Sequence, residues 1–346
     1  MAKKNATTLK DVAQHAGFSN ATVSYVLNGK AAEIGVAQKT VEKIEAVAEE
    51  LGYQPNYWAS SLARKSTGII SVLLHGLSGD WGDRVVYSLG QALRTKDYSP
   101  FLAVDWDDPL LFKKEVSSAI QRKDEGVICH SFVGDAKQYS RIVESDIPLV
   151  FVGDVPCSIH EMPGINSVVW NDAQAVKTAV EHLVDAGCRK IAFIGADHGV
   201  VSDRRRLAAF EEALVKAGLE SRKDWQFWMK LEPFSFAPTK ETLEFLFAPG
   251  KENPDALFAL NDSIAINILH VAAEMGIRFP EDAALMGLGD LPISEFAGLS
   301  TMREPLRELG EAAAQMIMEL IEEPDKKPLH REITCNELVV RKTTNK

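Results

Sequence analysis

The sequence lacks the features that mark a membrane protein, an exported protein or a disulfide-linked protein. No apolar run reaches the roughly 18 residues of a transmembrane helix, and no apolar segment of an export signal follows Lys3 and Lys4. The four cysteines lie far apart, at positions 129, 157, 188 and 335, with no C-x-x-C pair and no metal-like spacing. We therefore expect a cytoplasmic protein with buried free thiols and no bound metal.

Common catalytic signatures are absent as well. The sequence has no G-x-G-x-x-G after its first predicted strand, no P-loop and no G-x-S-x-G, and its eight histidines are scattered. We predict that the chain is not an enzyme and carries no cofactor. A carbohydrate-processing enzyme is the alternative, and incubation with plain and phosphorylated sugars would reveal its product.

Positive charge is scarce overall but not in the N-terminal segment. The 346 residues have a formal net charge of −11, and their length and globular composition favour two or three domains. Residues 1–66 nevertheless hold eight Lys or Arg against six Asp or Glu, so the rest of the chain is strongly acidic. Because phosphates repel an acidic body, this asymmetry favours the N-terminal segment as the part that contacts nucleic acid.

Three short amphipathic helices are predicted within the first 52 residues. Thr8 and Asp11 have the spacing of a capping box, and the helix that they open ends at Gly17. Ser19 caps a second helix over residues 20–27, and a third helix runs from about residue 37 to residue 51. Such a unit has a small core, and periodicity alone would fit a packing module equally well.

The side chains of the second helix favour a role in DNA binding. If Val23 and Val26 face inward, amide, methyl and hydroxyl groups near the helix N-terminus face outward, where a recognition helix meets base edges. Hydroxyl groups at the start of the helix suit phosphates, which position a protein without specifying sequence. The candidate base-reading residues are Asn20, Ala21, Ser24 and Tyr25, and the candidate phosphate-binding residues are Ser19 and Thr22.

The stretch TLKDVAQHAGFSNATVSYVLNG over residues 8–29 resembles the signature T-[IL]-x-D-V-A-x-x-A-G-V-S-x-x-T-V-S-x-V-L-N-G of LacI-family transcriptional regulators. The similarity continues through ELGYQPN over residues 50–56 and through ASSL over residues 59–62, which resembles the family's hinge-helix pattern A-R-x-L. The resemblance implies an all-α, three-helix helix-turn-helix domain over residues 1–54 and a hinge helix and linker over residues 55–67. The DNA-binding residues that it adds are Thr8, Asn28, Tyr53, Asn56, Ala59, Leu62 and Ala63.

Within the implied hinge, Leu62 takes the place of the leucine that the family wedges into the minor groove. Such a wedge unstacks a base step, and the contacts that DNA bending permits offset the cost. The alternative is a linker leucine that packs on the body. Tyr25, Val41 and Ser60 stand where many members carry Arg or another basic residue, and a phenol cannot make the bidentate Arg–guanine contact, so the operator preference should differ.

From residue 68 onward, apolar runs alternate with amphipathic stretches, as in an α/β fold with parallel sheets. Strands are predicted at 69–74, 101–104, 126–129, 149–152, 167–169, 191–194, 225–230, 256–259 and 284–288, and helices of the second series near 173–186, 203–217, 239–247 and 262–275. We expect a domain of two parallel-sheet lobes over residues 68–346. Lobe 1 would hold about 68–160 and 294–324, and lobe 2 about 161–293 and 325–346.

Two stretches of this body, VEHLVDAGCRKIAFIG over 180–195 and FALND over 258–262, are similar to the periplasmic-binding-protein-like effector domain of the same family. The resemblance implies three crossings between the lobes, near residues 160, 293 and 325, and a ligand between the lobes. Pockets at the carboxyl edges of parallel strands are also the general expectation. The effector-binding residues that the resemblance implies are Trp81, Asp154, Arg206, Asn261, Gly289 and Asp290.

Gly289 departs from the family pattern, which has an aspartate there that binds the effector in many members. Asp262 is expected to cap the following helix. Arg206 can fork onto vicinal hydroxyls, a carboxylate or a phosphate, and its alternative is a surface arginine. We therefore expect a plain hexose to bind poorly, which a titration would test. The effector remains a sugar, a sugar derivative or another metabolite.

The resemblance implies a sequence-specific repressor that binds a palindromic operator as a homodimer under the control of the effector. The effector would favour one of two lobe arrangements and so change operator affinity by allosteric coupling. Whether it acts as inducer or corepressor is open. The chain shows no leucine heptads after residue 340, which favours a dimer over a tetramer. A sugar-binding protein with no DNA role is the second alternative.

Overall fold

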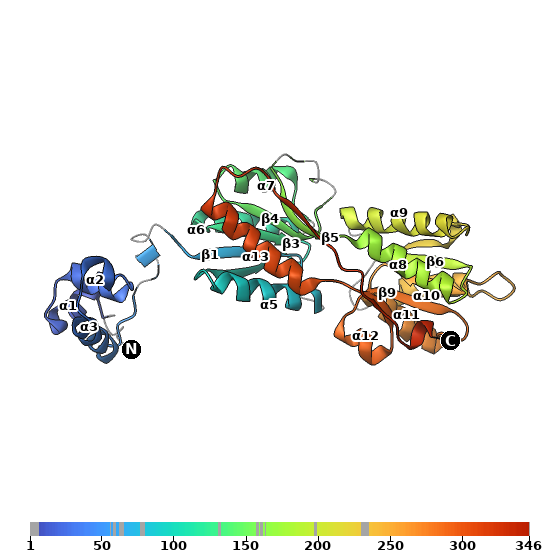
Figure 1. The fold of residues 1–346 in the computed structure, drawn as a ribbon, viewed down its shortest axis with the longest axis horizontal. Coiled ribbons are helices and arrows are strands. Elements are labelled where there is room, and N and C mark those ends of the chain that lie inside the picture. The colour runs from blue at the N-terminus through green and yellow to red at the C-terminus, as the bar shows by residue number, and fades with distance from the viewer. Residues whose placement is uncertain are drawn as a thin grey trace. The chain divides into compact units, whose positions relative to one another are not determined.

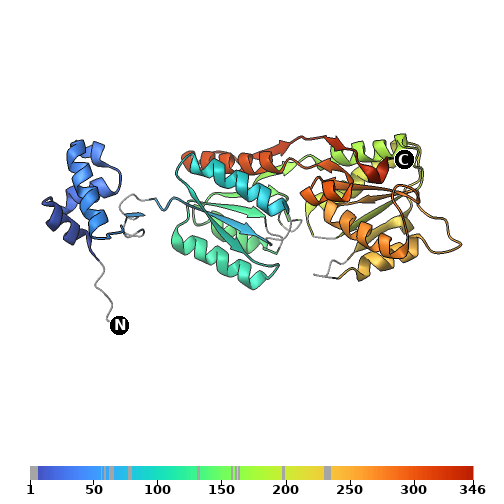
Figure 2. The same ribbon diagram turned by 90° about the horizontal axis from the view of Figure 1, so that it is seen from below.

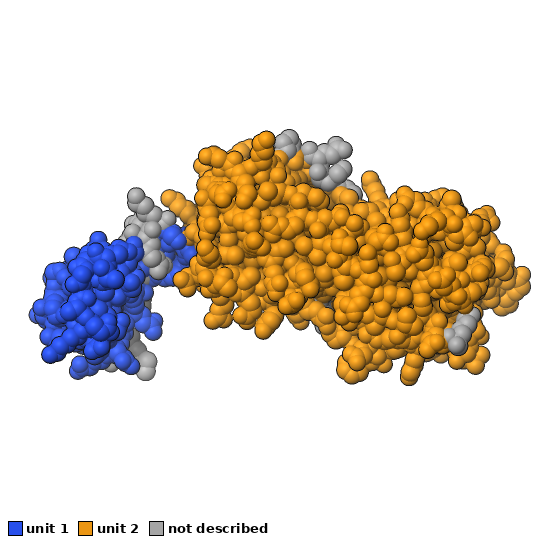
Figure 3. All heavy atoms as spheres, in the orientation of Figure 1, with its two compact units in different colours: residues 1–68 blue, residues 69–346 orange. Residues whose placement is uncertain are grey.

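The computed structural model describes residues 7–55, 57, 60–61, 66–76, 80–130, 133–156, 159, 162, 164–196, 199–229 and 235–345. The chain divides into two compact units, residues 1–68 and residues 69–346, which Figure 3 colours separately. Among the described residues, no helix has both the length and the apolar character to cross a membrane.

The N-terminal unit contains the three predicted helices (Figure 1): α1 (Leu9–Ala16), α2 (Asn20–Leu27) and α3 (Gln38–Glu50), with a 3₁₀ turn at Ala31–Ile34. The capping box forms as predicted, because the Thr8 hydroxyl accepts from the Asp11 N–H and the Asp11 carboxylate accepts from the Thr8 N–H. Gly17 ends α1 with φ of 77°, a left-handed conformation that glycine adopts without strain. The buried core consists of Val12, Ala13, Ala16, Val23, Val26, Ile44 and Ala48.

The second unit holds two six-stranded sheets that helices cover on both faces. Sheet I has the order β11-β5-β4-β3-β1-β2 and sheet II the order β12-β10-β9-β8-β6-β7. Every pairing is parallel except that of β10 with β12. The strands of sheet I are β1 (Ile69–Leu74), β2 (Ser99–Val104), β3 (Gly126–His130), β4 (Leu149–Gly153), β5 (Asn166–Trp170) and β11 (His330–Ile333); those of sheet II are β6 (Ile191–Ala196), β7 (Gln226–Met229), β8 (Ala256–Ala259), β9 (Ala284–Gly289), β10 (Ser300–Arg303) and β12 (Leu338–Val339).

Figures 1 and 2 show α5 and α13 on one face of sheet I and α6 and α7 on the other. Alternation along β1 explains this arrangement, because Val72 and Leu74 belong to the core under α5 and α13 while Leu73 belongs to the core under α6. The helices are α5 (Asp80–Arg94), α6 (Pro109–Arg122), α7 (Ala136–Val143), α8 (Asp172–Asp185), α9 (Val201–Lys216), α10 (Ala237–Leu246), α11 (Asp262–Met275), α12 (Pro292–Ala297) and α13 (Leu306–Glu322), with 3₁₀ turns at Lys223–Trp225 and Lys342–Thr344.

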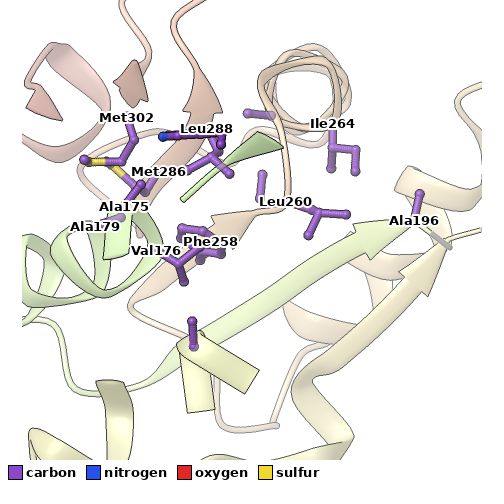
Figure 4. Packing of buried hydrophobic residues seen from close by; sticks show 14 of the residues in the cluster. Ala175, Val176, Ala179, Ala196, Phe258, Leu260, Ile264, Met286, Leu288 and Met302 are labelled. Atoms are coloured by element: carbon purple, nitrogen blue, oxygen red, sulfur yellow. The ribbon is translucent and has the colours of Figure 1, made fainter. Parts of the chain in front are cut away.

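In sheet II, buried strand side chains meet α8 on one face. Figure 4 shows Val176 of α8 close to Phe258 of β8, and Ala175 near Met286 of β9. All four side chains are fully buried. Small residues on α8 let the helix pack closely against the sheet. Because the packed interior is dense, it fixes the positions of the strand ends that carry polar residues.

The lobe boundaries differ from those predicted. β5 extends sheet I by pairing with β4, whereas the prediction placed it in the second lobe. β10 belongs to sheet II and β11 to sheet I, which reverses both predicted assignments. The chain therefore crosses between sheets after β5, after β10 and after β11, later in each case than predicted. Hydrogen-bond register decides which sheet a short strand joins, and apolar runs of four or five residues do not encode that register.

Candidate nucleic-acid interface and effector site

The N-terminal half of α2 exposes the polar face that the sequence predicted. Val23 and Val26 are buried, whereas Asn20, Ala21 and Tyr25 are exposed. The Tyr25 side chain is 40% exposed and is thus free to reach a base edge. Ser24 is half-buried. This arrangement gives α2 one face for the core and one face for a groove of DNA.

Several candidate DNA-binding residues also form hydrogen bonds at the ends of α1 and α2. The Ser19 hydroxyl accepts from the backbone N–H of Thr22 at 3.1 Å and lies 2.9 Å from the Thr22 hydroxyl. The Asn28 amide donates to the Ser24 carbonyl at 2.7 Å. Thr8 is the N-cap of α1. These contacts fix α1 and α2 before DNA arrives, which lowers the ordering cost of binding.

The remaining DNA-binding predictions concern the segment after α3. Tyr53 is half-buried against the core of the N-terminal unit, and burial raises the pKa of its phenol, so it stays a neutral donor. Asn56, Ala59, Leu62 and Ala63 lie outside the described residues. The hinge helix and the leucine wedge therefore stay predictions.

A pocket of about 230 Å³ opens where the strands of both sheets end. Sheet I contributes residues that follow or end β1, β3 and β4, and sheet II contributes residues that follow or end β8, β9 and β10. The start of α9 supplies the rest. Its lining residues are His75, His130, Gly153, Asp154, Val200, Ser202, Asp203, Arg206, Asn261, Asp262, Ser263, Leu288, Gly289, Leu291 and Glu304. Carboxyl ends of parallel strands are where ligands bind in such folds.

Arg206 lies in this pocket, as the sequence predicted, but its guanidinium is already engaged. Its Nε donates to Asp172 at 2.6 Å and its Nη1 to the carbonyl of Leu260 at 3.3 Å. Burial opposes the charge of the guanidinium, but the carboxylates of Asp172 and Glu304 outweigh burial and raise its pKa. Asp172 also accepts from Arg205. Arg206 is therefore a fixed donor, not a surface arginine.

Two pocket carboxyls, those of Asp154 and Asp262, are buried and accept hydrogen bonds from neighbouring residues. Asp154 is 7% exposed and accepts from the backbone N–H groups of Val155 and Ser202. Burial raises the pKa of the Asp154 carboxyl above its usual value. Asp262 is fully buried, and burial raises its pKa as well, although Ser294 and Thr301 donate to it at 2.6 Å.

Asn261, and not Asp262, caps α11. Its side-chain oxygen accepts from the backbone N–H of Ile264 at 2.9 Å. The prediction that Asp262 caps this helix is therefore wrong, because its carboxylate turns toward Thr301 and Ser294. The cap places the Asn261 side chain at the pocket wall, where the amide nitrogen can donate to a ligand.

Gly289 and Asp290 have separate positions. Gly289 lines the pocket with φ of 144°, a conformation that strains any residue with a Cβ. Asp290 instead lines a neighbouring cavity and accepts from Arg303 and Arg341 at 2.8 Å each. Asp290 is therefore engaged away from the predicted site. The side chain of Trp81 is not among those described.

Sequence reasoning did not name six polar pocket residues, one of which, Ser263, lies in the first turn of α11. His75 and His130 stand at the ends of the predicted first and third strands, so the rule that ligands gather at carboxyl ends could have found them. Ser202 and Asp203 begin α9. Glu304 follows β10, a strand that the sequence analysis did not predict, so nothing in the pattern pointed to it.

Both units resemble known proteins. Residues 8–56 match the family described as bacterial regulatory proteins, lacI family, and residues 180–344 match the periplasmic binding protein-like domain. The chain is 28% identical over 343 residues to the HTH-type transcriptional repressor PurR of Mannheimia succiniciproducens, covering 98% of this chain and 99% of that protein. It is also 28% identical over 342 residues to the ribose operon repressor of Halalkalibacterium halodurans, covering 98% of this chain and 97% of that protein.

The similarity extends to solved structures. The lac repressor dimer bound to operator and the anti-inducer ONPF matches with a TM-score of 0.83 at 25% identity, over 98% of this chain and 99% of that one. The complex of the transcriptional regulator CelR with cellobiose matches with a TM-score of 0.71 at 25% identity, over 97% of this chain and 99% of that one. The chain therefore joins a helix-turn-helix domain of the lacI family of bacterial regulatory proteins, over residues 8–56, to a periplasmic binding protein-like domain, over residues 180–344.

Proposed function

We propose that the protein is a transcriptional repressor that binds a palindromic operator as a homodimer. Its affinity for the operator would fall or rise when a small polar molecule binds in the pocket. It would act in the cytoplasm, where its DNA lies. The observation that carries the proposal is that one chain holds two features. The capped helix α2 exposes a polar face, and a polar pocket lies at the carboxyl ends of the strands of both sheets.

The direct readers of the operator would be the exposed residues of α2. Asn20 can bond adenine through its amide, and Ala21 can contact a thymine methyl group. Tyr25 offers one hydroxyl and an aromatic ring, so it would favour a different base from the guanine that an arginine selects. Ser19 and Thr22 would hold phosphates with the hydroxyl groups that also cap α2.

The proposed effector is small and rich in hydroxyl groups. Relatives include a ribose operon repressor, and one similar structure holds cellobiose. Asp154, Arg206 and Asn261 together offer acceptors and donors for hydroxyls, which suits that chemistry. Gly289 provides no carboxylate, so a plain hexose should bind poorly. A titration that shows tight binding of an unmodified monosaccharide would contradict this part of the proposal.

An exposed apolar edge of sheet I supports the homodimer. β2 is an edge strand, and its Phe101 and Leu102 are partly exposed. The flanking segments expose Tyr87, Trp106 and Leu110, each by more than half. An unpaired edge strand with apolar neighbours is a liability in a monomer. A second copy of the chain would cover it, and two copies would match the symmetry of a palindrome.

Operator selection tests the function directly. The purified full chain is offered random duplex DNA, and bound sequences are amplified and read, with and without a panel of metabolites. We expect a palindrome whose affinity changes in the presence of one member of the panel. A matched variant, Asn20→Ala, should lose selectivity within the half-sites, whereas Gln14→Ala, on an exposed part of α1, should keep it. If no sequence is enriched, the proposal fails.

A further inference from the structure

A second cavity, with a volume of about 420 Å³, lies beside β5 of sheet I. Alternation along β5 explains its position, because Val168 belongs to the core under α13 whereas Ser167 and Val169 line the cavity. The described linings of this β5 cavity and of the effector pocket have only Asp154 in common. The β5 cavity is therefore a separate space in the same unit.

The wall of the β5 cavity combines apolar side chains with charges of both signs. Its charged groups are Asp154 and Arg205. Two further polar groups satisfy each other, because the Ser167 hydroxyl lies 2.7 Å from Nδ1 of His330. Such a wall favours a ligand with an apolar body and two opposite charges. The apolar lining residues are Val155, Met162, Ile165, Val169, Val201 and Pro328.

The Asp154 carboxyl can accept a further hydrogen bond. A carboxylate has about four lone-pair sites, and the backbone N–H groups of Val155 and Ser202 donate to this one at 2.8 and 3.3 Å. Burial raises the pKa of Asp154, although these hydrogen bonds and the charges of Arg206 and Arg205 act in the opposite direction. A cation placed beside the carboxyl would therefore stabilise its ionised form.

The Arg205 guanidinium also has donors left for a ligand. Its Nε donates to Asp172, and its Nη2 donates to the Trp170 carbonyl at 3.3 Å. Within the described part of the chain, no acceptor bonds its Nη1 group. Asp172 also accepts from Arg206, so one carboxylate is shared between two guanidiniums and cannot cancel both charges. Arg205 can therefore donate to an anionic group.

Arg205 and Asp154 interact electrostatically without forming an ion pair. The charge of Arg205 lowers the pKa of Asp154, but no ion pair joins these two described side chains. Direct contact would have let each group satisfy the other. Because they are apart, a molecule between them could offer each one a group of opposite charge.

Ligands with a single charge fit the β5 cavity less well. A carboxylic acid would bind Arg205 but would meet the carboxyl of Asp154, and an amine would bind Asp154 but would approach Arg205. Each therefore gains one favourable contact and one repulsive contact. Among the described residues, no group of three or more His, Cys, Asp or Glu side chains is placed to bind a metal ion.

We propose that the β5 cavity binds an α-amino acid with an apolar side chain. The ammonium group would donate to Asp154, and the carboxylate would accept from the Nη groups of Arg205. The apolar side chain would contact the aliphatic wall, which includes Ile165 and Val169. This site goes beyond the proposed function, which assigns one ligand to the effector pocket.

The test compares amino acids with analogues that lack one charge. L-Valine, L-leucine, L-isoleucine, L-methionine and L-phenylalanine are titrated into the full chain at pH 7 by calorimetry. Each is paired with its amide, which lacks the carboxylate, and with the acid that lacks the amine, such as L-leucinamide and 4-methylpentanoate for L-leucine. At least one amino acid should bind about 10- to 100-fold more tightly than both of its analogues, because only the amino acid satisfies both charged groups.

Two results of these titrations would overturn the proposal. One is that none of the five amino acids binds. The other is that an analogue with a single charge binds as tightly as its parent amino acid, because the two opposite charges of the cavity would then not be what the ligand recognises.

Variants place the bound amino acid in the β5 cavity. Arg205→Ala should weaken binding at least about 10-fold, whereas Arg204→Ala, on the same helix but exposed and outside the lining, should bind as the wild type does. Ile165→Trp keeps both charges and fills part of the cavity, so it should also weaken binding. Thermal unfolding checks that each variant is folded. Undiminished binding by either folded variant, Arg205→Ala or Ile165→Trp, would contradict the proposed site.

The outcome is independent of the proposed function, because these titrations contain neither DNA nor effector. A protein that selects an operator but binds no amino acid would lose only the site in the β5 cavity. A protein that binds an amino acid but selects no operator would keep this site and would not be a repressor.

Discussion

Arg206 connects the pocket to the protein interior through a single guanidinium. Replacing it with alanine should abolish the response of operator binding to the effector and weaken effector binding by about 10- to 1,000-fold, since a charged hydrogen bond contributes roughly 1.5–3 kcal/mol and its removal leaves unpaired groups. Operator affinity without effector should stay within about twofold of wild type, because Asp172 keeps its bond to Arg205. Fluorescence anisotropy with labelled operator measures both quantities.

The neighbouring Arg204 offers a matched control for this experiment. It lies on the same turn of α9 and has the same charge, but it is exposed and does not line the pocket. Arg204→Ala should respond to effector as the wild type does. If Arg206→Ala responds normally, or if Arg204→Ala is the variant that fails, the pocket assignment is wrong.

The Asp154 carboxyl should make stability depend on pH in a predictable direction. Its pKa is raised in the folded protein, so the folded state holds this proton more tightly than the unfolded chain, whose value is about 3.9. The resulting stabilisation is fully present below the unfolded value and is lost as the pH rises through the folded value. An asparagine at this position cannot ionise, so Asp154→Asn should raise the free energy of unfolding at pH 7. This gain should exceed the gain at pH 4 by about 1 kcal/mol.

Asp224 provides the opposite case on the surface. Hydrogen bonds from Arg222 lower the pKa of the Asp224 carboxyl, so its stabilising effect exists above the unfolded value and disappears as the pH falls through the folded value. Urea unfolding of Asp224→Asn should show a loss at pH 7 that fades at low pH. If Asp154→Asn is as stabilising at pH 4 as at pH 7, burial is not what raises the pKa of Asp154.

At the scale of the element, the end of β9 depends on the absence of a side chain. A Cβ at Gly287 would lie 2.2 Å from Oδ1 of Asp262, and that oxygen is held by Thr301 at 2.6 Å. Gly287→Ala should therefore lower the free energy of unfolding by about 1–3 kcal/mol, as overpacking in a buried site does. Thermal unfolding measures the loss.

Gly90 serves as the control because it lies within α5, where a Cβ meets one side-chain atom at an ordinary 3.8 Å. Gly90→Ala should be neutral or stabilise by about 0.5–1 kcal/mol, since alanine loses less entropy in a helix than glycine does. Similar losses for both substitutions would show that Asp262 is free to move and is not fixed by its hydrogen bonds.

The predictability of each element follows from how local its signals are. α11 was predicted at its observed bounds, because Asn261 and Gly276 mark its ends within the sequence itself. β10 and β12 have four and two residues, and their membership in sheet II depends on pairing with distant segments. Glu304 belongs to the pocket only because β10 brings it there, which explains why the resemblance identified Arg206 and Asn261 but did not reveal this carboxylate.

At the scale of the whole molecule, the exposed edge of sheet I determines whether two chains can act together. Leu110 on α6 is 75% exposed beside this edge. Leu110→Asp should leave the folded monomer intact, because exposed substitutions change stability by about 0.5 kcal/mol or less. It should shift the sedimenting species from dimer toward monomer at micromolar concentration, because a charge at the centre of an apolar contact loses its water without gaining a partner.

Val215 on α9 is exposed to nearly the same degree, at 70%, but belongs to the other lobe, so the Val215→Asp protein should remain a dimer.

Dimerisation also determines how tightly the protein binds DNA. Two joined heads bind the second half-site as an intramolecular event, which strengthens binding to a palindrome by about 10²- to 10⁴-fold over one head. The Leu110→Asp protein should lose most of that gain in affinity for the palindrome. Its affinity for an isolated half-site should be almost unchanged. A dimeric Leu110→Asp protein, or a tetrameric wild type in sedimentation, would place the contact between copies elsewhere on the molecule.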